Sequence, residues 1–152
     1  MRDQVEVATA DEMRGLGRRL AAGLRAGDLL VLSGPLGAGK TTLVQGIGDG
    51  LGVRGPITSP TFVIARVHPS LCGGPALVHA DAYRLGGAAE IDDLDLDSGT
   101  DSSVTAVEWG EGLAEGLSDD RLEITIELSG NARTVRIAGV GRRWAGVALA
   151  PA

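Results

Sequence analysis

The chain has 152 residues, of which 43% are hydrophobic, and a formal net charge of −6. This length suits a single domain with its own core and leaves little room for a lid or a second substrate domain. Proteins that grip nucleic acid directly use clustered Lys and Arg to neutralise phosphates. The longest basic cluster here is Arg142-Arg143, which we expect to be a solvated pair. Stable direct binding of RNA or DNA is therefore disfavoured.

The cysteine count and the distribution of apolar residues indicate where in the cell the protein is expected. Cys72 is the only cysteine, so neither an intrachain disulfide nor a cysteine-based metal site is expected. The first residues lack the apolar centre of a signal peptide, and no apolar run is long enough to cross a membrane. We expect a cytoplasmic protein without membrane contact.

The first predicted elements are a short strand and a helix. Val5-Glu6-Val7 is the candidate strand, and Thr9 followed by Glu12 is typical of a capping box at a helix start. Apolar residues then recur at helical spacing, and Gly27 is the expected stop. These core residues are Met13, Leu16, Leu20 and Leu24.

The most informative stretch of the chain begins with a buried strand at residues 29–32. It continues into Gly34-Pro35-Leu36-Gly37-Ala38-Gly39-Lys40-Thr41, which fits the phosphate-binding pattern G-x-x-x-x-G-K-[ST]. An apolar helical pattern follows, which Gly50 and Gly52 are expected to end. Strand, glycine loop and helix in this order are the context that the motif requires.

Each residue type in this loop has a chemical reason. Glycines allow backbone N–H groups to converge on a phosphate at the helix N-terminus. Lys40, the only lysine of the chain, can reach the β- and γ-phosphates, and the Thr41 hydroxyl can be a ligand of Mg²⁺.

The second half of the chain predicts a mixed sheet. Residues 63–67 and 76–80 should form an antiparallel hairpin, and further strands are expected at 104–109, at 121–128 and around Val135 and Ile137. Residues 88–94 are a candidate short helix. We expect one α/β domain over residues 1–152, with its core at about residues 5–138 and a tail at 139–152.

Two acids end apolar strands and are candidates for holding a metal or orienting water. Glu108 follows residues 104–107, and Asp81 follows residues 77–80. Ligands of open α/β sheets lie beyond the carboxyl ends of strands, where both acids would lie. For each, an ordinary solvent-facing acid is the alternative. Ser59-Pro60-Thr61 is a candidate switch segment or a plain turn, and His79 is interpreted as a packing or hydrogen-bonding residue rather than a catalytic base.

Four motifs together resemble one family. They are GPLGAGKTT at 34–42, SPTF at 59–62, HADAYRL at 79–85 and VEWGEGL at 107–113. In this order they resemble the TsaE (YjeE) family, small bacterial P-loop ATPases required for the threonylcarbamoyladenosine modification of tRNA. The resemblance covers roughly residues 5 to 138. Ala80, Ala82 and Gly110 depart from the family pattern at packing or backbone positions.

The resemblance implies a P-loop α/β domain with a mixed sheet flanked by helices, and hydrolysis of ATP with Mg²⁺. It assigns the phosphates to a run made of Gly37, Ala38, Gly39, Lys40, Thr41 and Thr42.

The resemblance assigns the metal to Thr41 and Glu108, and it gives Asp81 a role at the metal or at the attacking water. Thr61 would belong to the switch-like segment. Thr9, Glu111 and Arg133 align, less directly, with outer contacts of the nucleotide.

The resemblance also implies partners. In this family the protein docks on a TsaB–TsaD heterodimer, which transfers the threonylcarbamoyl group, so tRNA is reached only through these proteins. A small-molecule P-loop kinase and a nucleotide-gated binding module with little hydrolysis are the alternatives. A GTPase is disfavoured, because its N-K-x-D motif needs a lysine other than Lys40.

Overall fold

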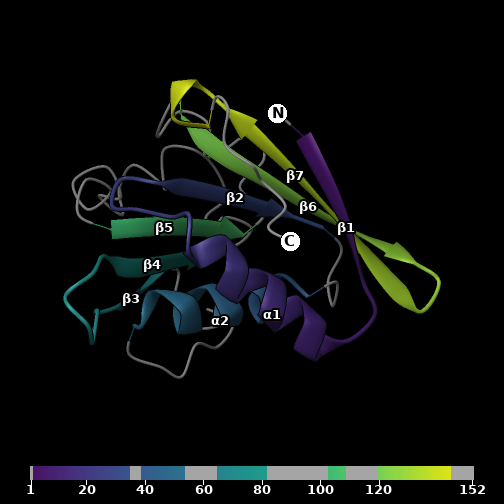
Figure 1. The fold of residues 1–152 in the computed structure, drawn as a ribbon, viewed down its shortest axis with the longest axis horizontal. Coiled ribbons are helices and arrows are strands. Elements are labelled where there is room, and N and C mark those ends of the chain that lie inside the picture. The colour runs from purple at the N-terminus through teal and green to yellow at the C-terminus, as the bar shows by residue number, and fades with distance from the viewer. Residues whose placement is uncertain (1, 35–38, 54–64, 82–102, 109–119, 145–152) are drawn as a thin grey trace.

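The computed structural model describes residues 2–34, 39–53, 65–81, 103–108 and 120–144 (Figure 1). Within these ranges the strands belong to one sheet in the order β1-β7-β6-β2-β5-β4-β3. The strands are β1 (Arg2–Val7), β2 (Leu29–Ser33), β3 (Ala65–His68), β4 (Ala76–Asp81), β5 (Ser103–Glu108), β6 (Arg121–Ser129) and β7 (Ala132–Val140). The helices are α1 (Ala10–Ala21) and α2 (Lys40–Leu51).

The sheet is mixed, as the sequence predicts. Strand β2 lies parallel to both β5 and β6, and β4 lies parallel to β5. The pairs β1–β7, β6–β7 and β3–β4 are antiparallel, which confirms the predicted hairpin of β3 and β4. All residues of β5 and the first four of β2 are buried, so these strands are covered on both faces, as is typical of parallel sheet strands.

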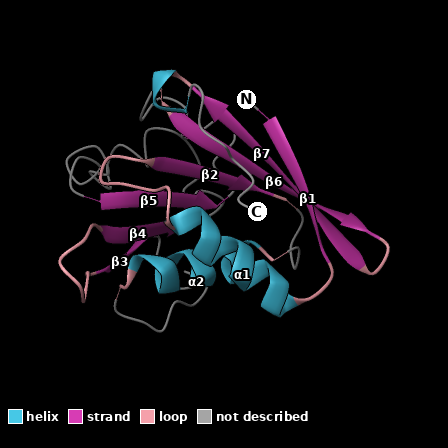
Figure 2. Ribbon diagram, viewed as in Figure 1, coloured by secondary structure: helices cyan, strands magenta, loops and turns pink. Residues whose placement is uncertain are grey.

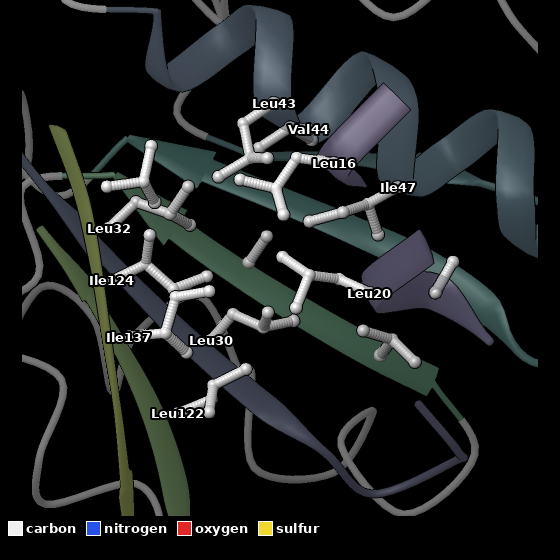
Figure 3. Close-up of a cluster of buried hydrophobic side chains, with 14 of the residues drawn as sticks. Leu16, Leu20, Leu30, Leu32, Leu43, Val44, Ile47, Leu122, Ile124 and Ile137 are labelled. Carbon is white, nitrogen blue, oxygen red and sulfur yellow. The ribbon is translucent and has the colours of Figure 1, made fainter. Parts of the chain in front are cut away.

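Helices α1 and α2 lie against the same face of the sheet (Figure 2). Along a strand, every second side chain points to the same face of the sheet. The apolar side chains of the two helices pack against the strand residues that point to their face. Figure 3 shows this core, with α2 residues above strand residues. Members labelled there are Leu16, Leu20, Leu30, Leu32, Leu43, Val44, Ile47, Leu122, Ile124 and Ile137.

The start of α1 is fixed by the predicted cap. The Thr9 hydroxyl accepts a hydrogen bond from the Glu12 N–H at 3.1 Å. The Glu12 carboxylate accepts in turn from the Ala8 N–H at 2.6 Å. Two N–H groups that the helix cannot satisfy are thereby paired, which holds residues 8 and 9 in place ahead of the helix.

Glycines let α1 and α2 approach each other closely. A Cβ atom on Gly17 of α1 would lie 2.4 Å from the Leu43 carbonyl oxygen of α2. A Cβ atom on Gly46 of α2 would lie 2.1 Å from the Arg14 carbonyl oxygen of α1. Neither position has room for a side chain, so the two helix backbones are in direct contact.

The predicted ends of both helices need correction. Helix α1 ends at Ala21, before Leu24, which packs partly buried against the core. Gly50 does not end α2 but lies inside it, where a Cβ atom would be 2.5 Å from the Cβ of Ala21. Gly52 is the actual C-cap, with a φ of 73°. Gly50 is thus a packing residue rather than a stop.

The predicted tail begins too early. Strand β7 continues to Val140, and the short helix η3 (Arg142–Trp144) places Trp144 in the core with 4% of its surface exposed. The Arg143 guanidinium is not solvated as predicted. It donates to both carboxylate oxygens of buried Asp28, at 2.9 and 3.1 Å, and stacks over the Trp144 ring. Residues 145–152 and the candidate helix at 88–94 lie outside the described part of the chain.

The contact between the helices predicts that Gly46→Ala lowers the free energy of unfolding by about 1–3 kcal/mol, because a methyl group there must push α1 away. Equilibrium urea unfolding measures this difference. Gly15→Ala is the matched control. Its Cβ would lie 3.6 Å from the nearest side-chain atom, so it should be neutral or stabilising by up to about 1 kcal/mol. Equal stability of Gly46→Ala and wild type would refute the close contact.

Candidate functional site

The phosphate-binding pattern lies between β2 and α2, and both described ends of its loop require glycine. Gly34 has a φ of 152°, and a Cβ atom there would lie 2.6 Å from the Ile126 carbonyl oxygen of β6. Gly39, the N-cap of α2, has a φ of 111°. Since other residues rarely adopt these angles, the motif glycines allow β2 to turn directly into α2.

Lys40 begins α2, and its side chain reaches back to the residue that follows β2. The residue is only 5% exposed, and its ammonium Nζ donates a hydrogen bond to the Gly34 carbonyl oxygen at 2.7 Å. A cation is therefore held at the N-terminus of α2. The free N–H groups of a helix start and a nearby ammonium both attract an anion.

Glu108 lies beside this loop because of the strand order. Its strand β5 pairs directly with β2, so that Glu108 lies level with Leu32, close to the end of β2. The Thr41 hydroxyl on the first turn of α2 lies 3.4 Å from each carboxylate oxygen of Glu108. Glu108 is 6% exposed, so its carboxylate is buried against the helix start.

Two residues of β4 lie next to Glu108. The backbone of Asp81 lies in register with it across the parallel pair β4–β5. The predicted juxtaposition of the two strand ends is thus present, although the side chain of Asp81 lies outside the described atoms. His79 is fully buried, and its Nε2 is hydrogen-bonded to Oε2 of Glu108. This agrees with the interpretation of His79 as a hydrogen-bonding residue.

A hollow of about 180 Å³ lies next to Gly39 and Thr42 at the start of α2. It brings together Thr9 and Arg133, two residues far apart in the sequence that were predicted as outer nucleotide contacts. The walls come from the start of α1, the start of α2 and the β6–β7 hairpin. The lining residues are Ala8, Thr9, Ala10, Met13, Gly39, Thr42, Asn131 and Arg133.

Four predicted site residues lie outside the described residues. They are Gly37 and Ala38 in the loop, Thr61 in the candidate switch segment, and Glu111 after β5. Their roles stay predictions that follow from the sequence.

The chemistry of the described side chains fits Mg²⁺ bound together with a phosphate. Mg²⁺ is usually held by one or two protein oxygens, with substrate phosphates and waters completing the octahedron. The Thr41 hydroxyl and the Glu108 carboxylate provide such oxygens at the start of α2. Within the described residues no group of three or more His, Cys, Asp and Glu side chains is placed to hold a metal ion by itself.

Comparison with known proteins identifies the family. A family model described as "Threonylcarbamoyl adenosine biosynthesis protein TsaE" matches residues 7–136. The chain belongs to the TsaE family. This confirms the resemblance drawn from the four motifs.

Several TsaE relatives cover most of the chain. A protein of Streptomyces coelicolor is 62% identical over 88% of this chain and 94% of its own length. A Bacillus subtilis protein is 37% identical over 88% of this chain and 84% of its own length. Both are named tRNA threonylcarbamoyladenosine biosynthesis protein TsaE.

A solved structure shows the same fold. The crystal structure of Bacillus subtilis YdiB superposes with a TM-score of 0.75 at 28% identity, covering 95% of this chain and 90% of that chain. This confirms the expected α/β class with a mixed sheet. Among the described residues no helix is both long and apolar enough to cross a membrane.

Sequence reasoning missed part of the site. Met13 was assigned to the core alone, yet its side chain also borders the hollow, 3.2 Å from where a Cβ on Gly39 would lie. Asn131, between β6 and β7, is a further lining residue of the hollow. The TsaE motifs contain neither residue, and only the folded hairpin brings Asn131 to the hollow. Because side chains along a strand alternate, His79 and Asp81 share one face of the sheet. The expected place of Asp81 near Glu108 could therefore have indicated that His79 lies near Glu108 as well.

Proposed function

We propose that this chain is a magnesium-dependent ATPase of the cytoplasm that takes part in the biosynthesis of threonylcarbamoyladenosine in tRNA. The observation that carries the proposal is the contact of Thr41 and Glu108 at the start of α2. It supports the proposal because a hydroxyl and a strand-end carboxylate lie together, and phosphate-binding loops use such a pair to hold Mg²⁺. The biosynthetic role is supported by membership of the TsaE family and by the names of its relatives.

The loop residues would bind and orient the triphosphate. Backbone N–H groups of residues 37–42 would surround the phosphates, as the motif predicts. Lys40 would exchange the Gly34 carbonyl oxygen for phosphate oxygens, because an ammonium–phosphate hydrogen bond is stronger than one to a neutral carbonyl. The outer part of the nucleotide would enter the hollow between Thr9 and Arg133.

Thr41 and Glu108 would hold the magnesium ion, which would neutralise charge on the β- and γ-phosphates. Asp81, level with Glu108 on β4, would assist at the metal or orient the attacking water. Thr61 would lie in a switch-like segment facing the γ-phosphate, and Glu111 would join the outer contacts. These last two roles rest on the family resemblance alone.

The proposed partners are proteins. The chain would dock on a TsaB–TsaD heterodimer and support repeated threonylcarbamoyl transfer by hydrolysing ATP. This proposal rests on the resemblance, and the acidic charge of −6 agrees with reaching tRNA only through these partners.

Replacing Lys40 tests the phosphate site. Lys40→Ala should weaken ATP binding at least about tenfold, because a charged hydrogen bond is lost from a buried site. Titration calorimetry measures this affinity. Arg18→Ala removes one positive charge at the surface, where Arg18 pairs with Asp49, and should leave the affinity unchanged. Unaltered ATP binding by Lys40→Ala would reject the proposed site.

Glu108 should affect hydrolysis more than binding. Glu108→Gln keeps the size of the side chain but removes its charge. Replacing a residue that only orients a metal ligand lowers activity by up to about a hundredfold, so loss of the proposed ligand itself should lower kcat by at least that factor. Much of the metal-free ATP affinity should remain, since the loop and Lys40 are intact. Single-turnover hydrolysis and ATP binding in EDTA separate the two effects. If Asp81→Asn abolished hydrolysis and Glu108→Gln did not, the two acids would exchange roles.

Arg133 should contribute affinity from the far wall of the hollow. Arg133→Ala should raise the Kd of ATP about tenfold, the effect of losing one hydrogen bond to a charged group. Arg136→Ala is the control on the same strand. Arg136 is exposed on the opposite face and pairs with Glu127, so its loss should not change the Kd. Equal affinities of the two variants would remove Arg133 from the nucleotide site.

A further inference from the structure

His79 lies in an unusual position for a polar side chain. The residue is fully buried in β4, on the face of the sheet that carries Leu77 and the two helices. Its Nε2 is hydrogen-bonded to Oε2 of Glu108, while its Nδ1 is buried without a hydrogen-bond partner among the described residues. A histidine needed only for packing could be replaced by an apolar residue, which would avoid the unpaired nitrogen.

The contact with Glu108 determines the tautomer of the ring. A carboxylate oxygen only accepts hydrogen bonds, so Nε2 must carry the hydrogen and donate it. His79 is therefore a donor aimed at one atom, Oε2.

This donor leaves the two oxygens of Glu108 in different situations. The Thr41 hydroxyl lies 3.4 Å from both oxygens, but only Oε2 is also hydrogen-bonded to His79 among the described atoms. We propose that His79 is a positioning residue, which holds the buried Glu108 carboxylate by Oε2 so that Oε1 remains available to the magnesium ion.

The inference deepens the proposed function and rests on it. Without the bond to His79, the Glu108 side chain could rotate about its terminal torsion, which is broad for glutamate. The carboxylate would then have to be reoriented each time the metal binds. Residues that orient metal ligands commonly change metal affinity or activity by about 10–100-fold when replaced.

The test compares two replacements of His79. His79→Leu removes the donor, and His79→Gln keeps an amide N–H donor near the place of Nε2. Binding of a non-hydrolysable ATP analogue is measured by calorimetry in EDTA and at a series of Mg²⁺ concentrations. For His79→Leu we expect the same affinity for the analogue as wild type in EDTA. The Mg²⁺ midpoint, which is the Mg²⁺ concentration that gives half of the magnesium-dependent change in this affinity, should rise by about 10–100-fold, the range for residues that orient metal ligands. For His79→Gln we expect a midpoint within a few-fold of wild type.

A control and a spectroscopic measurement separate positioning from a structural role. His68→Gln alters the only other histidine, a buried residue of β3, and should leave the Mg²⁺ midpoint unchanged. Nitrogen NMR of the wild type should show His79 with a hydrogen on Nε2, and the signals lost in His68→Gln identify His68. A hydrogen on Nδ1 instead would overturn the proposal, even if His79→Leu failed to fold.

The remaining outcomes are equally decisive. Folded His79→Leu with a wild-type Mg²⁺ midpoint overturns the positioning role and leaves the ATPase proposal intact. Folded His79→Gln that has lost the magnesium effect also overturns it, because the donor is retained. If wild type binds the analogue without any magnesium effect, the metal assignment of the proposed function fails, and the role of His79 fails with it.

Discussion

The parallel pairing of β2 with β5 is the constraint on which the site depends. Strand β2 leads into the phosphate-binding loop, and β5 ends in Glu108. Because the strands are adjacent and run the same way, Glu108 lies level with Leu32 and meets the first turn of α2. An antiparallel β5 would put the carboxylate at the opposite edge of the sheet, and a more distant parallel β5 would put it farther from α2. The site is thus a consequence of strand order and register rather than of the loop alone.

The polar groups of the site are embedded in the core that holds the fold together. Lys40, His79 and Glu108 are each at most 6% exposed, and leucines and valines of the same elements belong to the hydrophobic core. Buried polar groups of this kind cost stability unless they are paired. Lys40 is paired with the Gly34 carbonyl and Glu108 with His79 and Thr41, so the apolar surroundings hold these groups in place. Interactions at such a site are stronger than in water, because the effective dielectric constant is lower.

The sequence predicted the elements with strong periodicity or a specific motif. The alternation of β6, the hairpin of β3 and β4, the cap of α1 and the loop before α2 all have local physical causes. The sequence failed where a distant segment decides the outcome. Gly50 reads as a helix stop by itself, but its neighbour Ala21 on α1 makes it a packing position. Arg143 reads as a solvated charge, but buried Asp28 needs its guanidinium.

The residues of the candidate site also divide into those that a local signal marks and those whose place depends on distant segments. Lys40, Thr41 and Glu108 could be named in advance, because a motif or a strand end marks each of them. Asn131 could not, because its place at the hollow depends on the length and twist of the β6–β7 hairpin. The orientation of Glu108 by His79 also needed the structure, since sequence spacing does not specify which carboxylate oxygen is bonded.

The glycine contacts between α1 and α2 have a consequence for how the hollow can change shape. Thr9 and Met13 belong to α1 or its cap, and Thr42 belongs to α2, so two helices with touching backbones form one side of the opening. Sliding of one helix along the other would break the close fit at Gly17 and Gly46. The opposite side, with Asn131 and Arg133, belongs to a hairpin that is joined to the chain just before α1 by the pairing of Val7 with Arg133. The helical side of the hollow therefore keeps its shape through direct packing of two backbones, whereas the hairpin side is held by strand pairing.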